Sequence, residues 1–124
     1  MSDRHLLPSL LTDPAHTLRV ILTNVPPAVA DALARALVSE HVAACVNILP
    51  GVQSCYFWEG EVVQDVECTL LIKTDEEVLE RCIGRLVELH PYTVPEVVVL
   101  NPERVLEGYA SWARAATAGA SEEP

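Results

Sequence analysis

The chain has few basic residues, few aromatic side chains and no long apolar run. It contains 8 Lys and Arg against 18 Asp and Glu, so its formal net charge is −10. An acidic surface repels phosphate backbones and anionic lipid headgroups, which makes nucleic acids and membrane surfaces poor partners. No apolar segment approaches the roughly 20 residues that a helix needs to span a bilayer. Cations and basic protein surfaces are the partners that this composition favours.

The four cysteines do not form a recognisable metal or redox motif. Cys45, Cys55, Cys68 and Cys82 are spaced by 10, 13 and 14 residues, which fits neither a zinc ligand pattern nor a C-x-x-C pair. We expect them to be reduced and to pack as small apolar residues. Because aromatic residues make up only 5% of the chain, the predicted core is aliphatic.

The length of 124 residues suits a single domain. The first residues lack the basic segment and continuous apolar run of a secretion signal, so a cytoplasmic location is expected. Pro8, Asp13 and Pro14 are typical of a flexible segment. We therefore predict a disordered N-terminal tail at residues 1–16, one folded domain at 17–116 and a disordered C-terminal tail at 117–124.

Hydrophobic periodicity predicts an alternation of strands and helices. Apolar or alternating runs indicate strands, whereas apolar residues at spacings of three and four indicate helices that place one stripe on a sheet. The expected strands are residues 17–23, 43–49 with 52–58, 61–74 and 97–100, and the expected helices are 27–41, a segment from the capping residue Asp75 to His90, and about 105–116.

This order predicts an α+β fold of the ferredoxin-like, split β-α-β type. Four antiparallel strands carry the first two helices on one face, and the opposite face is left bare. The hairpin that turns at Glu59-Gly60 has unusually long arms. We expect identical subunits to cover the overhang, because apolar side chains on it would otherwise face water.

The segment His90-Pro91-Tyr92, followed by Pro95-Glu96, is the strongest candidate for a functional site. The prolines fix their own backbone and interrupt regular structure, so the polar side chains beside them are held in place. Histidine is also a common residue at the end of a helix. From these residues alone, a functional and a purely structural role for His90 both remain open.

The chain resembles the CutA family of divalent-cation tolerance proteins over about residues 18–114. The matching residues are Ala43-Ala44-Cys45-Val46-Asn47-Ile48, Pro50, Ser54, Tyr56-Phe57-Trp58-Glu59-Gly60, Asp65, Glu67 to Leu70, Ile72-Lys73-Thr74, His90-Pro91-Tyr92, Pro95-Glu96, Tyr109 and Trp112. The resemblance implies a ferredoxin-like homotrimer whose sheets meet edge to edge. Its proposed copper ligands, a cysteine and two consecutive histidines, correspond here to Thr23, Leu89 and His90.

The first functional hypothesis is a homotrimeric divalent-cation tolerance protein that responds to metal ions. It requires no cofactor and binds a divalent cation, copper or zinc, weakly at His90 and Glu96, since imidazole and carboxylate suit a borderline divalent ion.

The alternative is a trimeric regulatory or scaffold module without a physiological metal. A cleft between subunits would then hold a small ligand or an unknown protein partner, and its lining would be Tyr56, Trp58, Asp65, Glu67, Lys73 and Tyr92. Ion pairs of the charged members across strands are the structural alternative. An enzyme is not expected, because no nucleophile elbow or paired base and orienting acid is found in the sequence.

Overall fold

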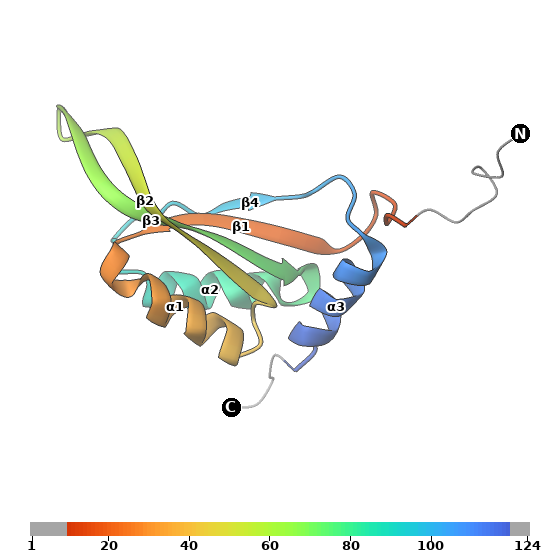
Figure 1. The fold of residues 1–124 in the computed structure, drawn as a ribbon. Coiled ribbons are helices and arrows are strands. Elements are labelled where there is room, and N and C mark those ends of the chain that lie inside the picture. Colours follow the sequence, from red (N-terminus) through yellow and green to blue (C-terminus); the bar gives the residue numbers. More distant parts are fainter. Residues whose placement is uncertain (1–9, 120–124) are drawn as a thin grey trace, which may run out of the picture.

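The computed structural model describes residues 10–119. It contains one four-stranded antiparallel sheet in the order β2-β3-β1-β4, with α1 and α2 lying side by side along it (Figure 1). This arrangement confirms the predicted ferredoxin-like α+β fold. The elements are β1 (Leu18–Val25), α1 (Pro27–Ser39), β2 (Cys45–Trp58), β3 (Glu61–Asp75), a 3-10 turn η2 (Glu76–Val78), α2 (Leu79–Leu89), β4 (Val98–Leu100) and α3 (Glu107–Thr117).

The hairpin of β2 and β3 extends beyond the rest of the sheet (Figure 1). Its turn residues Glu59 and Gly60 have φ values of 48° and 83°, which are the left-handed conformations that tight hairpin turns require. Strand β2 continues through Pro50 with a register shift between Leu49 and Val52. Because β1 ends at Val25, opposite Cys68 of β3, the outer half of β3 pairs with β2 alone.

The main core lies between the sheet and the helices α1 and α2. Alternate residues of β1 and β3 point toward these helices, which contribute Leu33 and Leu37 from α1 and Cys82 and Leu86 from α2. The core is aliphatic, as expected. Burial raises the pKa of the Cys82 thiol to about 12. Cys68 is also buried, but Cys45 is half-buried and Cys55 is exposed, so the expected burial of the cysteines is right for only two of the four.

Helix α3 covers part of the opposite face of the sheet. Leu18, Ala44 and Ala113 form a second buried cluster with Tyr109 packed against it. Strand alternation places Leu18 on the opposite face to Ile21, which belongs to the main core. The expectation of a bare face is therefore wrong at this end. Large apolar side chains elsewhere on this face and along the hairpin remain exposed, namely Leu49, Val98, Leu100, Phe57, Trp58, Val62 and Val66.

Residues 10–16 lie against the segment that leads into α3. The Thr12 amide donates to the Val105 carbonyl at 2.7 Å, and the Glu107 amide donates to the Leu10 carbonyl at 2.8 Å. These two hydrogen bonds join residues 10–16 to the segment before α3. The two tails and the domain limits stay predictions, and residues 1–9 and 120–124 lie outside the described part of the chain. No helix within residues 10–119 is long and apolar enough to cross a membrane.

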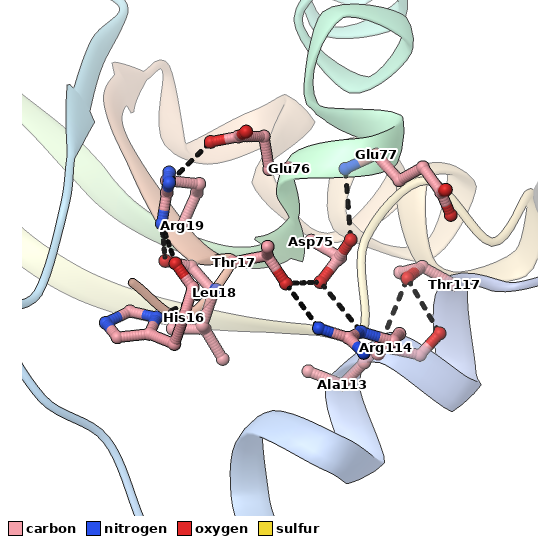
Figure 2. Close-up of polar contacts among 10 residues, drawn as sticks. All are labelled: His16, Thr17, Leu18, Arg19, Asp75, Glu76, Glu77, Ala113, Arg114 and Thr117. Carbon is pink, nitrogen blue, oxygen red and sulfur yellow. Dashed lines mark hydrogen bonds and ion pairs between the residues drawn. The ribbon is translucent and has the colours of Figure 1, made fainter. Parts of the chain in front are cut away.

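Asp75, the last residue of β3, joins three parts of the chain (Figure 2). Its carboxylate caps the start of the η2 turn by accepting from the Glu77 amide at 3.0 Å, as the sequence predicted. It also accepts from the Thr17 hydroxyl at 2.6 Å and lies 3.6 Å from Nε of Arg114 on α3. The buried carboxylate therefore fixes α3 and the first turn before α2 to the same strand end.

Thr23 offers a direct test of the core. Its Oγ1 is buried and has no hydrogen-bond partner within residues 10–119, and burying such a group costs about 1 to 3 kcal/mol. We expect Thr23→Val, which is nearly isosteric, to raise the free energy of unfolding by about 1 kcal/mol. Urea unfolding at a fixed protein concentration measures this change.

Thr74 supplies the matched control. It is equally buried, but its Oγ1 donates to the Val42 carbonyl at 2.7 Å. Thr74→Val should therefore lower the free energy of unfolding by about 1 kcal/mol or more. Equal effects of the two substitutions would contradict the assignment of Thr23 as an unpaired hydroxyl.

Candidate functional site

Two tyrosines and two carboxylates meet where the hairpin leaves the body of the sheet. The Tyr56 hydroxyl donates to Oδ2 of Asp65 at 2.5 Å. The Tyr92 hydroxyl donates to Oε2 of Glu67 at 2.6 Å. Glu67 is only 8% exposed. We call Tyr56, Asp65, Glu67 and Tyr92 the tyrosine–carboxylate cluster.

The fold explains why these four side chains come together. Asp65 and Glu67 are two residues apart on β3 and therefore point to the same face, about 7 Å apart at the usual rise of a strand. Tyr56 stands opposite Val63, on that same face. Since β1 stops opposite Cys68, it has no residue beside Glu67. The loop that follows α2 brings Tyr92 to this position instead.

Both phenols are held in the protonated, donating form. The hydrogen bond to Asp65 is the main cause that raises the pKa of Tyr56 above its ordinary value of 10.0. Partial burial raises the pKa of Tyr92, and the hydrogen bond to Glu67 and its charge raise it further. A carboxylate has about four lone-pair sites, so one phenol hydrogen bond leaves each carboxylate with capacity for a further donor or a cation.

His90 lies beside this cluster with both ring nitrogens engaged. It is 6% exposed, its Nε2 is 2.9 Å from the Asn24 carbonyl, and its Nδ1 accepts from the Tyr92 amide at 3.2 Å. The rings of His90 and Tyr92 are 4.8 Å apart between centroids. His90 is the residue at which α2 ends, as one of the two open interpretations expected, and its backbone amide donates to the Leu86 carbonyl. Its side chain contacts β1 and a member of the cluster instead.

Glu96 is held by the same strand residue as His90, through a different group. Its Oε1 accepts from the Asn24 side-chain amide at 2.8 Å, and the Thr69 hydroxyl donates to the other side of that amide at 2.5 Å. No group of three or more His, Cys, Asp or Glu side chains within residues 10–119 is arranged to hold a metal ion. Metal ligation by His90 and Glu96 stays a prediction.

Lys73 and Trp58 lie apart from the cluster. The Lys73 ammonium donates to Asn47 and lies 3.9 Å from the Cys45 sulfur. Lys73 lies six positions after Glu67 on β3, and none of the ion pairs found within residues 10–119 involves Asp65 or Glu67. Trp58 is 60% exposed near the hairpin turn. A role for both residues in a cleft between subunits stays a prediction.

The sequence interpretation missed Asn24 and Thr69. Asn24 connects His90, Glu96 and Thr69 through its carbonyl and side-chain amide. The available signal was a polar residue near the end of an otherwise apolar strand, directly before Val25-Pro26. Strand pairing then places Thr69 directly opposite Asn24.

Glu67→Gln is expected to lower the pKa of the Tyr92 phenol, because the neutral amide no longer disfavours the phenolate by charge. Partial burial persists, so the pKa should stay above the ordinary value of 10.0. Phenolate absorbance during an alkaline titration measures the change, and Tyr92→Phe identifies which phase belongs to Tyr92. Tyr109 is the internal control, because its raised pKa is caused by burial and by Cys45 and should not respond to Glu67→Gln.

The same shift sets the sign of a pH effect on stability. Above the unfolded pKa, near 10.0, the folded chain retains a proton on Tyr92 that the unfolded chain loses, so the free energy of unfolding falls as pH rises. Tyr92→Phe should reduce this decline. An unchanged slope would contradict a raised pKa in the folded state.

Comparison with known proteins shows a close relationship to one family. The family model described as CutA1 divalent ion tolerance protein matches residues 19–116. The divalent-cation tolerance protein CutA of Thermus thermophilus is 48% identical over 96 residues, which cover 77% of this chain and 93% of the relative. Neither name describes an enzyme.

Solved structures of relatives have the same fold. CutA from Synechococcus elongatus has a TM-score of 0.83 at 37% identity, covering 89% of this chain and 97% of that one. The same protein was also solved with a Bis-Tris molecule (TM-score 0.77, 36% identity, covering 86% and 98%). A relative from Archaeoglobus fulgidus (0.76, 28%, covering 81% and 98%) is described as periplasmic, so the cytoplasmic location stays a prediction. The chain belongs to the CutA1 family of divalent ion tolerance proteins.

Proposed function

We propose that this protein is a homotrimeric binding module that takes up a small cation at the tyrosine–carboxylate cluster. The observation that carries the proposal is the pair of Asp65 and Glu67, one exposed and one nearly buried, each oriented by a tyrosine hydroxyl. Burying a carboxylate is costly unless its charge is compensated. A cation beside Glu67 would supply that compensation. The Glu67 carboxylate has lone pairs left for it, because the Tyr92 phenol occupies only part of the carboxylate's hydrogen-bonding capacity.

Two sources of positive charge suit this cluster. The family is named for tolerance to divalent cations, and carboxylates are ligands for hard cations. The Synechococcus relative was solved with Bis-Tris, an amine that carries a positive charge when protonated and has several hydroxyl groups. Divalent metal ions and a protonated amine both carry the positive charge that the Asp65 and Glu67 carboxylates attract. They differ in size and in the geometry of their contacts.

A second candidate is the metal site at His90 and Glu96 that the sequence suggested. The supporting observation is that both side chains contact Asn24. Copper or zinc would have to displace at least one of the existing hydrogen bonds of His90. Neither candidate involves catalysis or requires a cofactor.

Isothermal titration calorimetry separates these candidates. Bis-Tris, at a pH where its amine is protonated, and zinc and copper in a non-coordinating buffer are titrated separately into the wild-type protein and three variants. Glu67→Gln should weaken binding of the cation that the cluster takes by about tenfold, or about 1.4 kcal/mol. Glu80→Gln, which removes the same charge from an exposed position on α2, should bind like the wild type.

His90→Ala tests the second candidate in the same experiment. If it abolishes zinc or copper binding while Glu67→Gln does not, the metal site lies at His90 and Glu96 and the cluster proposal fails for metals. Equal Bis-Tris affinity in Glu67→Gln and Glu80→Gln would refute the cluster as a site for the organic cation.

The homotrimer is supported by apolar surface that one protomer leaves uncovered. Val98 and Leu100 on β4 are 41% and 43% exposed, and Phe57 on the hairpin is 71% exposed. The outer edge of β2 is also unpaired by any strand of residues 10–119, and unpaired strand edges favour association. Copies of the same chain would bury both the apolar face and the projecting hairpin.

Sedimentation analysis tests the assembly. We expect a species of three times the chain mass at micromolar concentration, and Leu100→Asp should dissociate it by placing a charge on the buried face. Val87→Asp is the control, since Val87 is comparably exposed but lies on α2. A compact wild-type monomer would overturn the trimer.

A further inference from the structure

The tautomer of His90 follows from its two hydrogen-bond partners. The Asn24 carbonyl can only accept, so Nε2 carries the proton and donates to it at 2.9 Å. The Tyr92 amide can only donate, so Nδ1 is unprotonated and accepts from it at 3.2 Å. A neutral imidazole has a single lone pair in the plane of the ring. In His90 that lone pair is directed at Tyr92.

This arrangement does not suit a metal ligand. A metal ion needs the Nδ1 lone pair, which would break the bond to the Tyr92 amide, or a deprotonated Nε2, which would break the bond to β1. His90 as a whole residue is also only 6% exposed. Among residues 10–119 no third metal-ligating side chain completes a set with His90 and Glu96.

The contacts of His90 lead instead to Glu67. As the residue before Pro91, His90 is extended, with φ −75° and ψ 133°. Its ring holds the backbone of Tyr92 through Nδ1 and contacts the phenol ring at 4.8 Å. Tyr92 in turn donates to Glu67 at 2.6 Å. A continuous series of contacts therefore links the carbonyl at the end of β1 to the buried carboxylate on β3.

We infer that His90 is a positioning residue that holds Tyr92 over Glu67, and that it does not ligate a metal ion. The part of this inference that concerns binding rests on the proposed cation site. His90 acts through Tyr92 and has no contact with the cation. The Nδ1 bond sets the Tyr92 backbone, and the Nε2 bond anchors the imidazole to β1.

Two amide variants separate the roles of the two ring nitrogens. The side-chain oxygen of His90→Asn can replace Nδ1 and accept from the Tyr92 amide, whereas the amide of His90→Gln can replace Nε2 and donate to Asn24. If His90 positions Tyr92, the His90→Asn variant should keep its Bis-Tris affinity within about threefold of wild type. His90→Gln and His90→Ala should weaken Bis-Tris binding by about tenfold. Equal losses in Asn, Gln and Ala would overturn the positioning role.

Nitrogen-15 NMR of the imidazole tests the inference without any ligand of the cluster. We expect one protonated and one unprotonated ring nitrogen, with Nε2 as the protonated one. Addition of zinc should leave both His90 signals in place, and a selective shift or broadening of either would show that His90 ligates the metal.

Proton–proton contacts measured by NMR keep this inference separate from the proposed function. In His90→Ala the contact between the Tyr92 ring and the Glu67 side chain should disappear, while contacts between β1 and α2 in the core persist. Retention of the Tyr92–Glu67 contact would overturn the inference whatever Bis-Tris does. Loss of that contact together with unchanged Bis-Tris affinity in Glu67→Gln would refute only the cation site.

Discussion

The two-residue periodicity of β3 is the constraint on which the core and the candidate site both depend. Along its 15 residues, one set of alternate side chains, including Cys68, Leu70 and Ile72, packs under α1 and α2. The other set includes Asp65 and Glu67. A shift of one residue would exchange the two faces, so the hydrophobic core fixes which carboxylates face outward beside Tyr56. The site is therefore as rigid as the register of β3.

The tyrosine–carboxylate cluster can form because β1 ends before it reaches Glu67. From Cys68 to Asp75, β3 has β1 as its neighbour on this side. On the hairpin side of Cys68, β1 has ended, and the loop after α2 occupies the space beside β3. Pro91 ends the helix and His90 anchors the loop on the Asn24 carbonyl near the end of β1, so Tyr92 is placed within hydrogen-bonding reach of Glu67. Asn24 holds Glu96 and Thr69 around the same strand end.

The fold was predictable from the sequence because its signals are local. Apolar runs, the Glu59-Gly60 turn and the Asp75 cap each depend on neighbours in the sequence, and the structure agrees with them. The partners of the polar side chains depend on register and on loop paths. The sequence groups Lys73 with Asp65 and Glu67 as charged residues of one strand, but the strand register places Lys73 opposite Cys45, and its ammonium donates to Asn47. The cover that α3 provides was missed for the same reason, since it depends on which face a final helix returns to.

The positions that the family resemblance associates with copper have different chemistry in this chain. Thr23 directs its hydroxyl into the apolar core, Leu89 packs against that core, and His90 uses both nitrogens within the chain. These residues offer neither a thiolate nor an accessible imidazole, which are the ligands that soft or borderline ions prefer. Asp65 and Glu67, in contrast, lie on the opposite face with lone pairs to spare. Cation binding in this chain is therefore proposed at oxygen ligands oriented by tyrosines, where charge and hydrogen bonding determine selectivity more than metal softness does.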